Sequence, residues 1–130
     1  MPLINEAGGH IAELMLEADV VVGSGGMSVY ELAALGTPGI VLAQNAREDK
    51  RMREWSRHGT IEYLGLGPEV DEEALLAVVR SLLADADRRR RMSEKGRALV
   101  DGLGAARTAE MVLERRRQQR QPVGEAGGPR

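Results

Sequence analysis

The stretch that most constrains the fold of this 130-residue chain lies at residues 18–31 and reads ADVVVGSGGMSVYE. Its valines predict a buried strand, and the Gly-Ser-Gly-Gly run at residues 23–26 predicts a tight loop. The pattern of residues 28–35 predicts a helix. Glycines let a backbone approach a ligand closely, and the first N–H groups of a helix have no intrahelical partner. Because the helix dipole also attracts anions there, we expect a phosphate-bearing ligand at residues 23–28. A strand-to-helix turn without a ligand explains the loop alone equally well.

Strand and helix patterns alternate along the rest of the chain. Such alternation is typical of parallel βαβ units with right-handed crossovers. We therefore predict an α/β fold with three layers, a Rossmann-like parallel sheet of about three strands with helices on both faces. The expected strands are 18–22, 39–43 and 60–64, and the expected helices are 6–18, 28–35, 46–58, 87–103, 105–121 and one capped by Asp71. One domain at 1–121 holds these elements, and residues 122–130 predict a disordered tail.

The composition limits what the core can be made of. Apolar residues make up 42% of the chain and aromatic residues only 2%, so aliphatic side chains and methionine must fill the core. His10 and His58 have no metal-ligand residues at useful spacing and are expected at the surface. The arginine runs at 88–91 and 115–117 are expected to form solvated faces. In the last third of the chain, the expected core positions are Met92, Leu99, Val100, Met111, Val112 and Leu113.

Charge, cysteine content and hydropathy exclude several classes of function. The formal net charge of -2 argues against a nucleic-acid-binding protein, which usually carries a basic excess. The chain has no cysteine, so it has no disulfide or thiolate chemistry, and this fits a reducing cytoplasm. No apolar stretch approaches the ~18 residues of a membrane span, and no signal peptide is visible. We expect a cytoplasmic protein with no metal and no cofactor.

Residues 18–43, ADVVVGSGGMSVYELAALGTPGIVLA, resemble the C-terminal nucleotide-sugar-binding domain of GT-B glycosyltransferases. The resemblance is to the peptidoglycan N-acetylglucosaminyltransferase type, in which a strand, a glycine pair, a helix with a glutamate and a G-x-P turn carry the donor site. Residues 40–49, IVLAQNARED, are also similar to sugar-nucleotide hydrolases of pseudaminic acid synthesis and to spore-coat polysaccharide proteins. The resemblance covers about residues 6–113 and implies that residues 1–121 form part of a GT-B C-terminal domain.

The resemblance implies a role for each residue of a donor site. Gly25 and Gly26 would approach the donor diphosphate, and the Ser28 hydroxyl would hydrogen bond to a phosphate oxygen. The Glu31 carboxylate would accept hydrogen bonds from both ribose hydroxyls, since it has two acceptor oxygens. Residues 44 and 45 would face the sugar. The full set of expected substrate-binding residues is Gly23, Ser24, Gly25, Gly26, Met27, Ser28, Glu31, Gln44 and Asn45.

Two parts of this site have a second interpretation. Ser28-x-x-Glu31 is also a capping box, in which the serine bonds a helix N–H and the glutamate reaches back. The charged residues Arg47, Asp49, Lys50 and Arg51 either line the cleft or lie on an exposed helix. The transferases carry a glutamine-rich stretch at this point, where this chain has Arg47, Glu48, Asp49 and Lys50, so the resemblance leaves the identity of the sugar open.

The resemblance implies the UDP-sugar-binding part of a glycosyltransferase, which transfers a hexosyl group such as N-acetylglucosamine when completed by further segments or a partner. The alternatives are a non-catalytic nucleotide-binding or assembly module, or a fragment of a sugar-nucleotide hydrolase. Three further strands of the donor domain and the acceptor-binding domain of the family are not in these 130 residues, and no residue here has the context of a catalytic base. We therefore expect no turnover by this chain alone and assign no catalytic residue.

The expected sheet also predicts association. Three parallel strands leave two open edges, which invite pairing with another chain. We expect either a homo-oligomer or a partner chain that supplies the acceptor domain. In its simplest form the homo-oligomer is a symmetric dimer, formed by pairing of sheet edges or by packing of helices across a two-fold axis.

Overall fold

The computed structural model describes residues 8–26 and 28–120. Three strands form the sheet, namely β1 (Val21–Ser24), β2 (Gly39–Ala43) and β3 (Ile61–Leu66). The α-helices are α1 (Ile11–Glu17), α2 (Ser28–Leu35), α3 (Ala46–Trp55), α4 (Glu72–Ala84), α5 (Ala86–Leu99) and α6 (Gly104–Arg120). Short 3-10 turns lie at Gly8–His10, Ser56–His58 and Gly67–Glu69.

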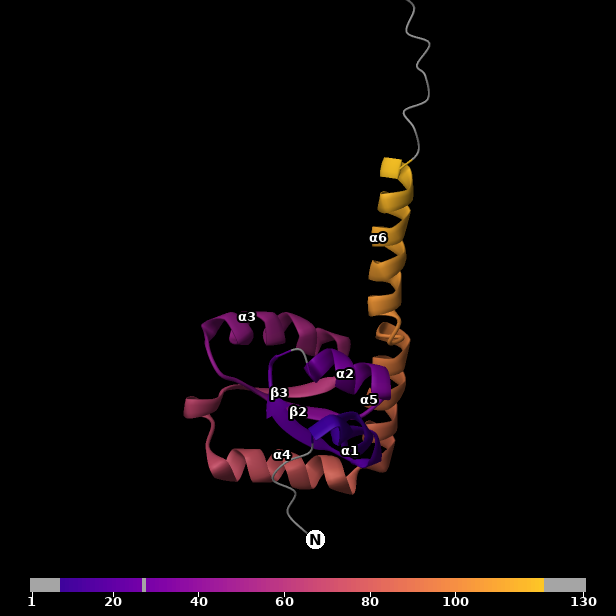
Figure 1. The fold of residues 1–130 in the computed structure, drawn as a ribbon. Helices are drawn as coiled ribbons and strands as arrows, with labels where there is room; N and C mark the ends of the chain where they lie inside the picture. Colours follow the sequence, from indigo (N-terminus) through magenta and orange to yellow (C-terminus); the bar gives the residue numbers. More distant parts are fainter. Residues whose placement is uncertain (1–7, 27, 121–130) are drawn as a thin grey trace, which may run out of the picture.

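The sheet is parallel, and its strand order β1-β2-β3 follows the sequence. Val21 pairs with Gly39, and Gly39 in turn pairs with Ile61, so the three strands begin level with one another. The helices α2 and α3 cover one face of the sheet, and α4 covers the other (Figure 1). The predicted α/β fold, with a three-stranded parallel sheet between helical layers, is therefore confirmed.

Alternating side chains of β2 build a separate core on each face of the sheet, as the two-residue period of a strand requires. Val41 packs with Met52 of α3 and with Val29 and Ile61, and the rings of Tyr30, Trp55 and Tyr63 border this cluster. Ile40 packs on the opposite face with Leu82 and Met92. Because both faces are apolar, β2 reads as a continuous hydrophobic run, which is typical of a central parallel strand.

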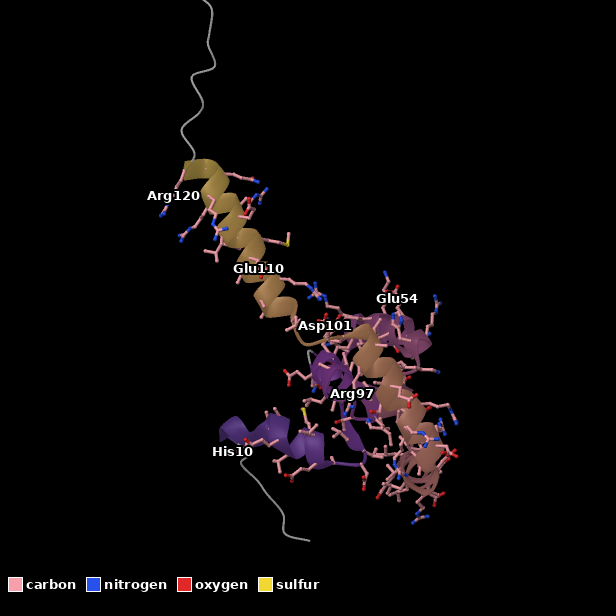
Figure 2. All side chains as sticks on the ribbon, turned by 90° about the vertical axis from the view of Figure 1, so that its right-hand side faces the viewer. His10, Glu54, Arg97, Asp101, Glu110 and Arg120 are labelled. Atoms are coloured by element: carbon pink, nitrogen blue, oxygen red, sulfur yellow. The ribbon has the colours of Figure 1, made fainter. Side chains whose placement is uncertain are left out.

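Helix α5 lies against α2 and fixes it in place. Gly96 is so close to α2 that an added Cβ would come within 2.8 Å of the Ala33 carbonyl oxygen. The α2 helix ends at Leu35 and is followed by Gly36, whose φ of 72° is in the left-handed region that glycine adopts easily. The next residue, Arg97 (labelled in Figure 2), donates a hydrogen bond from its guanidinium to the Leu35 carbonyl oxygen at 3.4 Å.

The expected core positions at the C-terminal end are wrong, except for Met92, which is 6% exposed, and Val100, which is half-buried. Leu99 is exposed, and every residue of α6 is exposed, including Met111 at 72%. Figures 1 and 2 show α6 projecting away from the sheet and its covering helices. An apolar side chain is buried only where a partner surface meets it, and within residues 8–26 and 28–120 no element covers Met111, Val112 or Leu113.

Several boundaries differ from the expected ones. The first strand begins at Val21, where the N–H bonds to the Pro38 carbonyl at 3.0 Å and the parallel ladder starts, not at residue 18. The expected helix 87–103 ends at Leu99, shortly before Gly102, whose φ is 78°. Asp71 caps α4 as expected, accepting a bond from the Glu73 N–H. The expected tail at 122–130 lies outside the described residues.

Candidate functional site

The candidate site lies where β1 and β2 end. Ser24, the last residue of β1, pairs with Leu42, so the loop after β1 and the residues after β2 leave the same edge of the sheet. In open parallel sheets, ligands bind in the crevice outside the carboxyl ends of the strands. The structure therefore brings together the described residues of the two groups that the sequence assigns to the site, namely 23–26 and 28 in the first group and 44–45 in the second.

A single carboxylate joins these two loops. Oε1 of Glu48 accepts a hydrogen bond from the Gly25 N–H at 3.0 Å and a second one from the Gln44 N–H at 3.3 Å. Glu48 lies in the first turn of α3 and is only 9% exposed. Because a buried carboxylate is costly without partners, these two bonds are the reason it is tolerated there.

Gly25 is held from α3 at more than one atom. Besides the bond from its N–H, its carbonyl oxygen accepts a bond from the Arg51 guanidinium at 3.1 Å. A Cβ at this position would lie 2.5 Å from Cγ of Met52, so the absence of a side chain lets α3 pack directly beneath the loop. Gly26, in contrast, has open space where a Cβ would be.

The expected sugar-facing residues lie at the start of α3. Gln44 and Asn45 are both exposed. Asn45 is the N-cap of α3, and its Oδ1 accepts the Glu48 N–H at 2.9 Å. The side-chain oxygen of Asn45 therefore already bonds within the protein, whereas Gln44 contributes its backbone N–H to the Glu48 carboxylate.

Ser28 and Glu31 lie on the first turn of α2. Ser28 is half-buried and Glu31 is exposed. Among the residues that the structure describes, neither side chain forms a hydrogen bond, so the capping box that these residues also predict is not seen there. Gly23 and Ser24 are half-buried at the end of β1, and Met27 lies outside the described residues.

The charged residues of α3 divide between the two interpretations offered by the sequence. Arg47 and Lys50 are exposed, whereas Asp49 faces β3. The Tyr63 hydroxyl donates to Asp49 at 2.5 Å, and Arg53 pairs with the same carboxylate at 3.1 Å. The Tyr63 hydrogen bond, followed by Arg53, lowers the pKa of Asp49. Burial, followed by the Asp49 hydrogen bond, raises the pKa of Tyr63 to about 12.

Glu48 is the residue that the sequence reasoning missed. The signal for it is Asn45-x-x-Glu48, a capping residue followed three positions later by glutamate. That pattern predicts a helix start, and Asn45 does cap α3. It does not predict that the glutamate turns toward Gly25, which lies 23 positions earlier in the chain.

The described residues form neither a metal-binding cluster nor a membrane-spanning helix. Within that part of the chain, no group of three or more histidine, cysteine, aspartate or glutamate side chains is placed to hold a metal ion. None of the helices formed by the described residues is both long enough and apolar enough to span a membrane.

No protein-family model matches the chain. The chain is 31% identical over 104 residues to the spore coat polysaccharide biosynthesis protein SpsG of Bacillus subtilis, across 80% of this chain and 31% of that protein. It is also 36% identical over 101 residues to a protein of Rubrobacter xylanophilus named UDP-N-acetylglucosamine--N-acetylmuramyl-(pentapeptide) pyrophosphoryl-undecaprenol N-acetylglucosamine transferase. That match covers 74% of this chain and 30% of the relative. The chain thus spans about a third of the length of each relative, and the similarities relate it to glycosyltransferase-like proteins at modest identity.

Proposed function

We propose that the edge formed by the ends of β1 and β2 binds the nucleotide of a UDP-linked sugar, and that this chain is the donor-binding part of a glycosyltransferase. The observation that carries the proposal is the meeting of the Gly25 loop, the first turn of α2 and residues 44–45 at one edge of the sheet. The names of the two relatives, one of which contains UDP-N-acetylglucosamine, support the same substrate class.

We assign each part of the ligand to particular site residues from their contacts. Since the Gly25 N–H is bonded to Glu48, the diphosphate is met by Gly26 and by the N–H and hydroxyl of Ser28 at the start of α2. Glu31 lies three residues further along the same first turn of α2, and its exposed carboxylate accepts hydrogen bonds from the ribose hydroxyls. Gln44 and Asn45 lie on the sugar side.

Calorimetric titration with UDP tests the proposal. We expect the wild-type chain to bind UDP, and Glu31→Ala to weaken binding by about 1–3 kcal/mol, the range for a hydrogen bond to a charged group. Glu17→Ala, which removes an exposed carboxylate at the end of α1, is the matched control and should bind as the wild type does. Absence of UDP binding by the folded wild type would refute the proposal.

We further propose that the chain does not transfer sugar by itself and works in a cytoplasmic setting. The site residues described above bind and orient a nucleotide, and none of them has the partners of a general base. Transfer of a hexosyl group such as N-acetylglucosamine then depends on further protein that binds the acceptor and excludes water. A product assay with the purified chain and UDP-N-acetylglucosamine should show no transfer, and measurable transfer would contradict this.

A non-catalytic nucleotide-binding or assembly role is the second candidate, and the exposed apolar residues favour it. Ile11 and Leu16 of α1 and Val22 of the edge strand β1 are 46%, 57% and 47% exposed. We propose that the open side of the edge strand β1, and not the strand ends that form the candidate site, pairs with a second copy or with the partner that brings the acceptor site. Light scattering at low micromolar concentration should give a mass above that of a monomer, and Val22→Lys should lower it. A monomer mass for the wild type would exclude a homo-oligomer.

A further inference from the structure

Glu48 is the most deeply buried acidic residue next to the candidate site, and the proposed function gives it no part beyond occupying the Gly25 N–H. Its Oε1 bonds two backbone N–H groups, Gly25 at 3.0 Å and Gln44 at 3.3 Å. These two groups belong to successive βα loops. In the proposed site one loop faces the phosphates and the other faces the sugar, so a single atom lies at the junction between both halves of the ligand.

The helix that carries Glu48 is itself firmly fixed. Asn45 caps its first turn, Met52 is completely buried beneath it, and Asp49 bonds to Tyr63 of β3. Because α3 is fixed, the Glu48 side chain holds the backbone groups that bond to it in fixed positions relative to α3. Arg51, three residues after Glu48, grips the Gly25 carbonyl oxygen, so both polar backbone groups of Gly25 are bonded to side chains of α3.

We propose that Glu48 is a positioning residue that holds the phosphate-facing and sugar-facing loops in their ligand-ready arrangement. The proposal rests on the proposed function for the ligand, and on the two hydrogen bonds for the mechanism. Glu48 does not touch the ligand. It removes the conformational freedom of both loops before binding, so that less ordering entropy is lost when a nucleotide sugar arrives. It also uses the Gly25 N–H internally, which shifts anion binding to Gly26 and Ser28.

The two hydrogen bonds by which Glu48 holds the loops are tested first without any ligand, by amide hydrogen exchange measured residue by residue with NMR. In the wild type, the Gly25 and Gln44 amides should exchange slowly because the Glu48 carboxylate protects them. In Glu48→Ala both amides should exchange about tenfold faster or more, the change that corresponds to losing a hydrogen bond accepted by a carboxylate. Glu54→Ala, which removes an exposed carboxylate from the same helix (Figure 2), should change neither. Unchanged exchange at Gly25 and Gln44 in Glu48→Ala would overturn the proposal.

The second arm measures binding of UDP. Glu48→Ala should lose about tenfold or more in affinity while keeping the circular dichroism spectrum of the wild type. Glu48→Gln keeps an accepting oxygen at the same place and should recover most of the loss, which a role as a negative charge alone would not produce. Wild-type affinity in Glu48→Ala, or no recovery in Glu48→Gln, would overturn the positioning role. Absence of UDP binding by the wild type would instead refute the proposed function. The hydrogen-exchange result would then decide by itself whether Glu48 holds the two loops.

If Glu48→Ala does not fold, the amide chemical shifts of Glu48→Gln test the proposal by themselves. Exchanging the carboxylate for an amide changes the acceptor of both bonds, so the Gly25 and Gln44 amide signals should move together. Shifts confined to α3 itself would overturn the proposal.

Discussion

Helices α3 and α6 are both rich in charge, yet only one of them belongs to the body of the molecule. In α3, a single buried methionine, Met52, and two bonded carboxylates, Glu48 and Asp49, tie a polar helix to the sheet and to the loop after β1. In α6, three consecutive apolar residues from Met111 onward are at least half exposed, and no residue is buried.

The difference teaches that polarity alone does not decide which helix is integrated. Of the ten residues of α3, only Ala46 and Met52 have wholly apolar side chains. The indole N–H of Trp55 is polar and donates a hydrogen bond to the Thr60 hydroxyl at 3.0 Å. Polar side chains integrate a helix when their bonds are made to other elements. The ion pairs of α6 join residues of the same helix, or its Arg107 to the nearby Asp101, and so give it no hold on the sheet.

The largest expected difference between the two helices comes from their methionines. Met52→Ala should lower the free energy of unfolding by about 2–5 kcal/mol, because it empties a fully enclosed position. Met111→Ala should change it by less than about 0.5 kcal/mol, as for other surface substitutions. Urea unfolding followed by circular dichroism measures both. A loss of several kcal/mol for Met111→Ala would show that α6 is covered in solution and would break the comparison.

A smaller effect is expected where α3 meets the loop after β1. Gly25→Ala places a Cβ against Met52 and should cost about 1–3 kcal/mol of stability, the usual range for overpacking. Gly26→Ala adds the same methyl group one position later, where no atom lies within 4 Å, and is the matched control for stability. Equal unfolding free energies for the two variants would mean that α3 does not pack beneath Gly25.

The smallest effect concerns pH. The raised pKa of Tyr63, about 12, means that its contribution to stability is complete below the unfolded value of about 10 and is lost as the pH rises through the folded value. The lowered pKa of Asp49 acts at the other end, since its contribution is present above the ordinary carboxyl range and is lost as the pH falls through the folded value.

Tyr63→Phe should therefore flatten the stability profile of the protein at both ends. Urea midpoints for the wild type and the variant, measured in steps from acid pH to about pH 11, check this prediction. The two curves should differ most near neutral pH and converge toward the alkaline limit. Parallel curves over the whole range would show that the Tyr63–Asp49 bond is not formed in solution.

The sequence predicts the elements of the sheet better than their surroundings. The bounds of α2 and β2 agree with expectation, and Asp71 caps α4 as predicted, because glycine, proline and capping residues act locally. The exposure of Met111 could not be predicted in this way. Helical periodicity reports that a stripe of apolar side chains exists, and it does not report whether another surface covers that stripe.

The candidate site shows the same limit. The sequence predicts that the residues after β1 and β2 come together, because parallel strands end at a common edge. It leaves the charged residues after Asn45 divided between cleft and solvent. The bond between Glu48 and Gly25 depends on how α3 is held against the sheet. Met52 in the core and the bond from Tyr63 of β3 to Asp49 hold α3 there, and neither contact can be deduced from the local sequence around Glu48.

The strand order of the sheet has a consequence for how the protein folds. Each strand pairs with the strand nearest to it in the sequence, so each parallel pairing closes only one short crossover. Loop-closure entropy rises with loop length, and folding is faster when contacts are local. Since β2 is the neighbour of both other strands, neither β1 nor β3 can join the ladder before it. Assembly of the sheet must therefore nucleate on β2 and spread outward. The candidate site, which includes contacts from α3 of the second crossover, is complete only when both crossovers have closed.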